Sequence, residues 1–285
     1  MRGNPLSGKD PSAHSRLRRG GALSLARIVA WQGRAVLAGF VVVLAVVGLA
    51  AVAYADVPPW GAVKSVQVDV IGDSLSTGFR TPGDTWPGQA QALVKNMGLK
   101  ADITNASENG AGYVQPGELG DVFEDLVNRI VNSQSQVVVL FGSDNDTGDP
   151  GLAAAAQATL ARVKELAPHA TVIVVGPTSE SGDPGETLGE IRQVVSQQGA
   201  AIGARFVDPV ALGWFQGTAA QFLSSDLEHP NVAGETYLAQ HMGAILAPAI
   251  KSAMLQDQLR RKISTDAVSA GLGKHRRPAA QPILP

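Results

Sequence analysis

Residues 136–175 read QVVVLFGSDNDTGDPGLAAAAQATLARVKELAPHATVIVV. This stretch contains an apolar run at 136–141, an alanine-rich helical pattern at 152–166 and a β-branched run at 171–175. Short, continuously apolar runs predict strands that are buried on both faces, and a helix between two such strands indicates a parallel pair with a right-handed crossover. The stretch therefore predicts a β–α–β unit in the centre of an α/β domain.

The same alternation continues on both sides of this unit. Further strands are predicted at 63–71, 101–105 and 204–207, and further helices at 86–97, 122–131, 186–198 and 232–254. Repeated units of this kind form a three-layer α/β/α fold with a mainly parallel sheet, whose site lies at the carboxyl ends of the strands. We expect one such domain over residues 64–258, after a linker at 56–63.

The N-terminal part of the chain predicts a membrane segment. Residues 1–34 are basic, and the 21 residues at 35–55 carry no charge. A helix of this length, at ~1.5 Å per residue, crosses a hydrocarbon core of ~30 Å. Basic residues before the run place the N-terminus in the cytoplasm and the remaining chain outside. Ala53-Tyr54-Ala55 also fits a cleavage site, so a retained anchor, which we favour, and a secreted form are both open.

Charge and composition exclude several functions. Residues 56–258 hold 23 acidic and ten basic side chains, so this part is a poor partner for nucleic acid, whose binding requires a basic face. The chain has no cysteine, which removes disulfides and a thiol nucleophile. The basic segment at 259–285 is predicted to be a disordered tail that meets anionic envelope polymers.

A serine motif follows the first predicted strand. The sequence GDSLS at 72–76 contains a glycine that lets the backbone turn sharply and expose Ser74 at a helix N-terminus. Backbone amides and the helix dipole favour developing negative charge there. An ordinary turn or N-cap is the alternative interpretation of this motif.

Two further polar segments follow the next strands. NASENGAG at 105–112 contains glycines that can offer a free amide, and it lacks the third glycine of a dinucleotide fingerprint. In GSDND at 142–146, Asn145 can donate its amide to an oxyanion and Asp146 can brace the loop. A calcium loop is excluded because the twelfth position from Asp144 is Ala155, where a bidentate glutamate is required.

A histidine with an acidic partner precedes the last predicted helix, in DLEHPN at 226–231. Asp226 and His229 are three residues apart, so on a helical turn the carboxylate reaches Nδ1 and leaves Nε2 facing outward. Of the five histidines, only His229 has an acid at this spacing in a loop after a strand. A solvated D-x-x-H without a function is the alternative.

In this order, the four segments resemble the SGNH (GDSL-type) hydrolases over roughly residues 64–250. The resemblance implies a flavodoxin-like α/β/α fold and hydrolysis of acyl esters, with no cofactor and no metal. It implies that Ser74 is the nucleophile, His229 the general base and Asp226 its orienting acid. The Ser74 amide, Gly110 and Asn145 would form the oxyanion hole.

One departure affects these assignments. The third block of the family usually reads G-x-N-D, whereas an extra residue here separates Gly142 from Asn145. Either the loop bulges and Asn145 keeps the donor role, or Asp144 takes its place. We favour the bulge, because a carboxylate beside an oxyanion raises the barrier. Spacing from Asn105 favours Gly110 over Gly112.

The expected function is an extracytoplasmic serine hydrolase that cleaves small-molecule, lipid or glycan acyl esters through an acyl-enzyme. Two alternatives are an acyltransferase that modifies envelope glycans and a non-catalytic envelope-binding protein on the same fold. The sequence predicts neither the acyl chain and alcohol of the substrate nor the oligomeric state.

Overall fold

A computed structural model of the chain describes residues 64–142, 144–179 and 185–272. The predicted transmembrane helix at 35–55 lies outside these ranges. Within them, every helix is too short or too polar to cross a membrane.

Five strands form one parallel sheet in the order β2-β1-β3-β4-β5. This order is that of flavodoxin-like folds. The strands are β1 (Val66–Gly72), β2 (Ala101–Asn105), β3 (Ser135–Phe141), β4 (Thr171–Val175) and β5 (Arg205–Val207). The helices are α2 (Ser74–Thr77), α3 (Trp86–Asn96), α4 (Phe123–Ile130), α5 (Leu152–Leu166), α6 (Gly185–Ala201), the 3-10 helix η2 (Gly217–Phe222) and α7 (Val232–Leu272).

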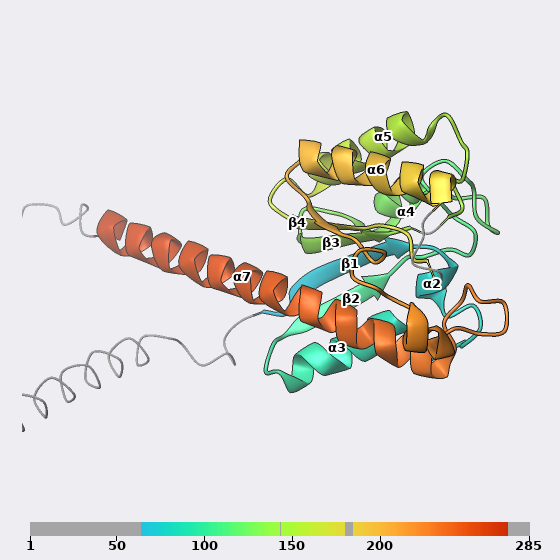
Figure 1. Cartoon of the computed structure of the whole chain (residues 1–285). Coiled ribbons are helices and arrows are strands. Elements are labelled where there is room, and N and C mark those ends of the chain that lie inside the picture. The colour runs from blue at the N-terminus through green and yellow to red at the C-terminus, as the bar shows by residue number, and fades with distance from the viewer. Residues whose placement is uncertain (1–63, 143, 180–184, 273–285) are drawn as a thin grey trace, which may run out of the picture. The chain divides into compact units, whose positions relative to one another are not determined.

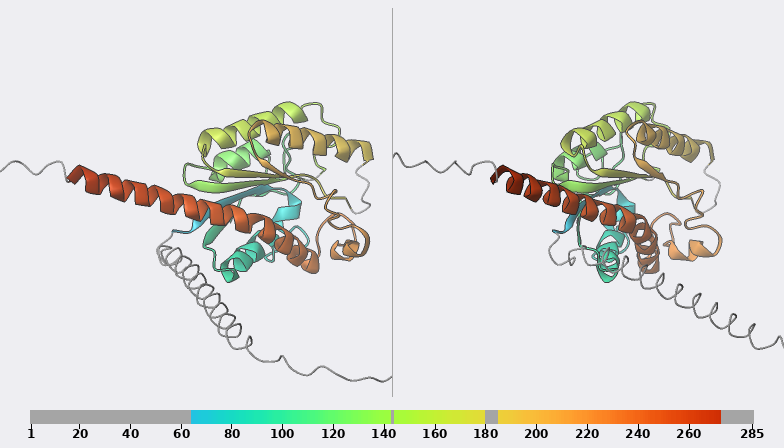
Figure 2. Two further views of the ribbon diagram at one scale, coloured as in Figure 1. Left: turned by 60° about the vertical axis from the view of Figure 1, so that its left-hand side comes forward. Right: turned by 90° about the vertical axis from the view of Figure 1, so that its left-hand side faces the viewer.

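Helices cover both faces of the sheet, as Figure 1 and the two turned views in Figure 2 show. Successive side chains of a strand point to opposite faces, so β3 contributes to two cores. Val137, Val139 and Phe141 pack on the side of α3 and α7, whereas Val138 and Leu140 pack on the side of α4, α5 and α6. Burial on both faces accounts for the continuously apolar sequence of this strand, and the predicted parallel α/β architecture is confirmed.

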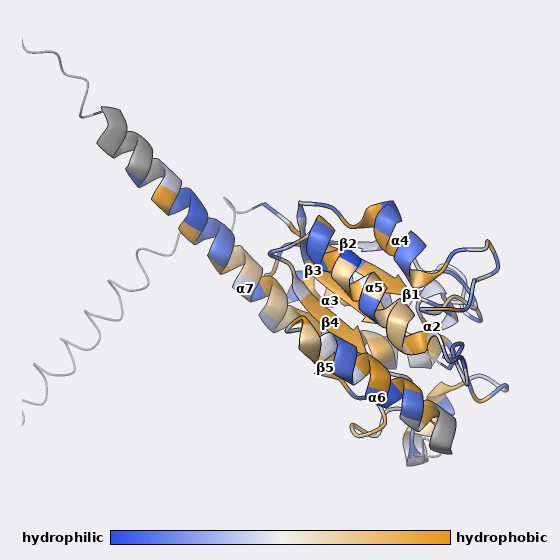
Figure 3. Ribbon diagram, turned by 90° about the horizontal axis from the view of Figure 1, so that it is seen from above, coloured by the Kyte–Doolittle hydropathy of each residue, from blue (hydrophilic) through white to orange (hydrophobic). Residues whose placement is uncertain are grey.

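Helix α7 is longer than the sequence predicted. The expected helix ended at Met254, and the prediction of a disordered tail at 259–285 is wrong for residues 259–272, which continue α7. Residues 255–270 contain no glycine or proline, and Arg261 donates to Asp257 one turn earlier at 2.8 Å, which stabilises a helix. Helix α7 projects from the domain, and residues 259–264 of this extension are mostly hydrophilic (Figure 3).

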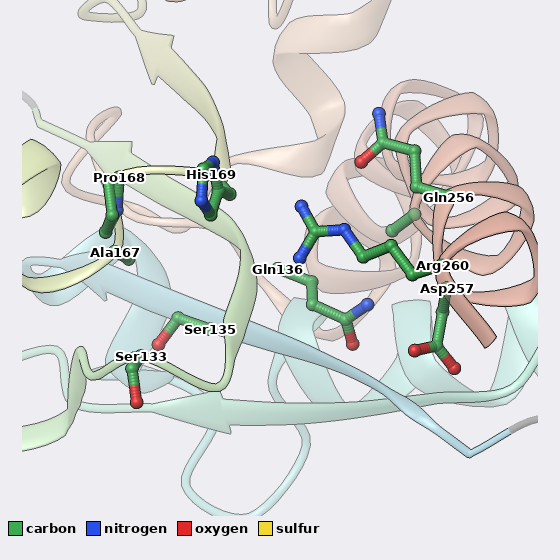
Figure 4. A pocket seen from close by; sticks show the side chains of 10 residues that line it. Ser133, Ser135, Gln136, Ala167, Pro168, His169, Gln256, Asp257 and Arg260 are labelled. Carbon is green, nitrogen blue, oxygen red and sulfur yellow. The ribbon is translucent and has the colours of Figure 1, made fainter. Parts of the chain in front are cut away.

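The two ends of the sheet are different. Loops that follow β1, β2 and β3 meet at the carboxyl ends of the strands. The opposite end carries a separate cavity at the start of β3, between the loop before β4 and α7, into which Arg260 points (Figure 4). His169 lies at this opposite end, in the loop where the sequence predicted it.

Candidate active site

Residues from four separate segments line one cavity at the carboxyl ends of the strands. Ser74 comes from the turn after β1, Gly110 from the loop after β2, Asn145 from the loop after β3, and His229 from the loop before α7. We name this space the serine cavity; its lining residues are Ser74, Phe79, Asn109, Gly110, Pro116, Gly117, Glu118, Asn145, Glu228 and His229.

A second space shares Glu228 with the serine cavity. We name it the leucine cavity; its lining residues are Leu75, Asp144, Thr178, Leu188, Phe215, Leu223, Asp226, Leu227 and Glu228. The structure thus brings together all the predicted site residues around two adjacent cavities.

Ser74 occupies the first position of the short helix α2, as predicted. Asp73 caps this helix, because its Oδ1 accepts the Leu75 amide at 2.9 Å. Gly72 is required at the end of β1, since a Cβ there would lie 2.8 Å from the Ser76 hydroxyl and 3.0 Å from the Phe141 carbonyl. Ser74 is only 8% exposed, so its access to solvent is through the serine cavity.

His229 contacts Asp226, although not by the route that the spacing suggested. Nδ1 lies 3.2 Å from Asp226 Oδ2, but residues 226–229 form an irregular loop rather than a helical turn. Leu227 takes a left-handed conformation with φ of 61°, and Asp226 Oδ1 accepts the amides of Glu228 and His229 at 3.2 and 3.0 Å. These bonds fold the carboxylate back onto its own loop and toward the imidazole.

The Asp226 carboxylate is held in its charged form. Burial by itself would raise its pKa, but hydrogen bonds from the His229 and Glu228 amides, from Arg80 and from the imidazole hold the pKa well below its usual range. Arg80 Nε donates to the same Oδ2 at 2.8 Å. A charged carboxylate with both oxygens engaged therefore orients the imidazole through Nδ1.

Sequence reasoning missed two residues beside His229. The Phe79 ring lies 4.8 Å from the His229 ring between centroids, and the Arg80 guanidinium lies 4.9 Å from the same Phe79 ring. Arg80 and Phe79 therefore enclose the Asp226–His229 pair from the side of α2. No local pattern marks them, because Arg80 and Asp226 are 146 residues apart in the chain.

The loop after β3 places Asn145, and not Asp144, beside Ser74. Asn145 lines the serine cavity, and its Nδ2 donates to the Ala111 carbonyl at 3.0 Å and to Asp73 Oδ2 at 3.3 Å. Asp144 is exposed and faces the leucine cavity. Asn145 is therefore the residue of this pair that shares a cavity with Ser74.

Both candidate glycines, Gly110 and Gly112, lie in the loop after β2, and their surroundings differ. Gly110 has φ of 76° and lines the serine cavity. The Gly112 amide already donates to the Gln115 carbonyl at 2.8 Å, and a Cβ on Gly112 would lie 2.4 Å from the Asp146 carboxylate. Gly110 is therefore the glycine that faces the cavity.

Asp146, in the loop after β3, braces the loop after β2. Its Oδ2 accepts the Tyr113 amide at 2.8 Å, and its Oδ1 accepts the amides of Val114 and Gln115 at 2.9 and 3.0 Å. The carboxylate is buried, and both its oxygens accept backbone amides.

A buried glutamate that the sequence did not reveal connects two parts of the site. Glu235, in the first turn of α7, is 1% exposed and accepts the Thr81 hydroxyl and the Trp86 amide, each at 2.7 Å. Burial raises the pKa of Glu235 to about 7, although these two hydrogen bonds act in the opposite direction. The bonds tie the segment after Ser74 to the helix that follows His229.

A parallel α/β sheet with a serine and a carboxylate-paired histidine at its carboxyl edge is an arrangement typical of serine hydrolases. The chain belongs to the GDSL-like lipase/acylhydrolase family, whose model matches residues 70–237. It is accordingly an ester-hydrolysing enzyme, and the family that the sequence motifs indicated is confirmed.

Individual relatives agree with this membership. The chain is 38% identical over 189 residues to the GDSL lipase Rv0518 of Mycobacterium tuberculosis, a match that covers 63% of this chain and 81% of the relative. The crystal structure of a lipase/acylhydrolase from Enterococcus faecalis superposes with a TM-score of 0.50 at 21% identity, covering 66% of this chain and 96% of that one. TesA gives the same TM-score and identity over 64% and 99%.

Glu235 predicts a specific pH dependence of stability. The pKa of Glu235 is raised in the folded state, so its protonated carboxyl group stabilises the fold. This stabilisation is fully present below pH 4.5, the pKa of the group in the unfolded chain, and is lost as the pH rises through about 7. Glu235→Gln has no such proton to lose. Between pH 4.5 and 7, urea denaturation should show wild type losing roughly 1 to 3 kcal/mol more than the variant.

The matched control is Glu165→Gln, which removes an exposed carboxylate at the end of α5. Its stability should follow wild type across the same pH range. Parallel curves for wild type and Glu235→Gln would contradict the assignment of a raised pKa to Glu235.

Proposed function

We propose that the chain is an extracytoplasmic serine esterase that cleaves carboxylic esters through an acyl-enzyme on Ser74. The observation that carries the proposal is the contact of His229 Nδ1 with a charged Asp226, at a cavity that also contains Ser74. The membership in an acylhydrolase family, and the name of the mycobacterial relative as a lipase, support acyl esters as the substrate class.

In this mechanism, His229 Nε2 takes the Ser74 proton while Oγ attacks the ester carbonyl. Charge develops on the carbonyl oxygen, and the Ser74 and Gly110 amides can donate to it. Asn145 Nδ2 donates to the Ala111 carbonyl and to Asp73 Oδ2, so it reaches the oxyanion by giving up the longer of these bonds, that of 3.3 Å to Asp73. In residues 64–142, 144–179 and 185–272, neither the Ser74 backbone amide nor the Gly110 backbone amide has a hydrogen-bond partner. The protonated imidazole then gives its proton to the departing alcohol, and water activated by the same imidazole releases the acid.

The first test removes the nucleophile and the base. Ser74→Ala and His229→Ala should each lower p-nitrophenyl acetate turnover by several orders of magnitude, and the double variant should lose little more, because the residues act as one unit. A Ser74→Ala protein with a rate near wild type would overturn the mechanism.

The second test separates Asn145 from Asp144. Asn145→Ala should lower kcat by ~10²-fold, about 3 kcal/mol, with little change in KM, because its hydrogen bond strengthens only in the transition state. Asp144→Asn changes a side chain of the leucine cavity and should have a mild effect. The reverse pattern, in which Asp144→Asn raises activity and Asn145→Ala changes nothing, would remove Asn145 from the oxyanion hole.

The position in the cell is part of the proposal. It is supported by the uncharged run at 35–55 with basic residues before it. A retained anchor predicts that the full chain sediments with membranes, resists carbonate extraction and loses its catalytic domain to protease added from outside. A soluble product that begins at Asp56 would instead show cleavage after Ala55.

A further inference from the structure

All charged residues that line the two cavities are acidic. Glu118 and Glu228 lie at the serine cavity, and Asp144, Asp226 and Glu228 lie at the leucine cavity. No lysine or arginine belongs to either lining in the described part of the chain. An approaching ester therefore meets carboxylates in the lining of each cavity.

Only one of these carboxylates has a cationic partner of its own. Asp226 is paired with Arg80. The Glu118 side chain accepts a neutral hydrogen bond from Asn109 Nδ2 at 3.1 Å. Glu228 Oε2 lies 4.0 Å from His229 Nδ1, its side chain is 49% exposed, and Asp144 is exposed as well. Among the residues that the structure describes, no lysine or arginine pairs with Glu118, Glu228 or Asp144.

A cleft lined by one sign of charge focuses the electrostatic potential and changes the local concentration of a charged substrate. The donors proposed for the oxyanion are neutral N–H groups directed at one atom, so they do not offset this potential for a charge elsewhere on the substrate. The uncompensated carboxylates thus act on the remainder of the acyl and alcohol groups.

We propose that Glu118, Glu228 and Asp144 select substrates by charge. The enzyme takes esters whose acyl and alcohol parts are neutral or cationic, such as acyl groups on uncharged glycans. It discriminates against esters with a carboxylate or phosphate near the scissile bond, a class that includes glycerophospholipids. This proposal rests on the proposed esterase function and names the substrate class of the same site.

The test compares three acetate esters of similar shape on the full-length protein at pH 8: anionic 3-acetoxybenzoate, neutral 3-acetoxybenzamide and cationic 3-acetoxy-N,N,N-trimethylanilinium. The order of kcat/KM should be cationic and neutral above anionic, with roughly a tenfold gap at low ionic strength. The gap should narrow several-fold in 1 M NaCl, where the Debye length is about 3 Å.

The variants assign the effect to particular residues. The measured quantity is the ratio of kcat/KM for 3-acetoxybenzoate to that for 3-acetoxybenzamide, in which the intrinsic reactivity of the two esters cancels between proteins. Glu118→Gln should raise this ratio roughly two- to threefold, and Glu118→Gln with Glu228→Gln should raise it further, within the roughly tenfold gap. Glu165→Gln, with the same change of charge at the other end of the domain, should leave the ratio unchanged.

The possible failures are distinguishable. Suppose that wild type hydrolyses 3-acetoxybenzamide and that Ser74→Ala loses this activity, so that the proposed function holds. If neither salt nor Glu118→Gln then alters the ratio of the two kcat/KM values, charge selection alone is overturned. If wild type hydrolyses none of the three esters, or Ser74→Ala hydrolyses them equally fast, the proposed function fails and charge selection fails with it.

Discussion

The geometry of the site depends on buried carboxylates that accept backbone amides from neighbouring loops. Loops at the carboxyl edge of a parallel sheet have amides without strand partners, and a buried amide left unpaired costs roughly 1 to 3 kcal/mol. Asp146 satisfies three such amides at 113–115, Glu108 accepts the Leu119 amide, and Glu235 accepts the Trp86 amide. The Asp146 and Glu235 bonds join segments distant in sequence, and the Glu108 bond closes the loop after β2, so together they fix the loops that carry the site residues.

Acidic side chains in this domain differ in charge state because their surroundings differ. Asp226 receives two amides, a guanidinium and an imidazole, and its pKa is held low. Glu235 is more deeply buried and receives one hydroxyl and one amide, so burial dominates and its pKa is raised to about 7. Asp226 therefore keeps its negative charge beside the imidazole that it contacts. Glu235, which joins the segment after Ser74 to α7, is protonated more easily.

The sequence predicted features that depend on local pattern. The strands at 101–105 and 171–175 and the helix at 152–166 agree with the structure to the residue. For 171–175 and 152–166 the apolar pattern reports burial directly. The Asp226–His229 contact could be predicted from the sequence because the two residues are three positions apart. Partners that only the fold brings together, such as Arg80 with Asp226, leave no local signal. The sequence did not predict the last part of α7, residues 255–272, because a basic composition there is typical of a disordered tail. The residues in this part nevertheless favour a helix.

Charge is arranged asymmetrically around Ser74, and this asymmetry matches the chemistry proposed for it. In the proposed first step, a proton moves from Ser74 to His229, so positive charge forms on the imidazole while negative charge forms on the carbonyl oxygen. Asp226 and Glu228 lie on the Nδ1 side of the imidazole, where the positive charge forms. The proposed donors to the negative charge are neutral N–H groups, and Asp226 lies between the imidazole and the Arg80 guanidinium, so a carboxylate separates these two cationic groups. Glu228, which lies beside the imidazole, is also one of the three carboxylates proposed to select esters by charge, so one residue links the proposed chemistry to the proposed substrate preference.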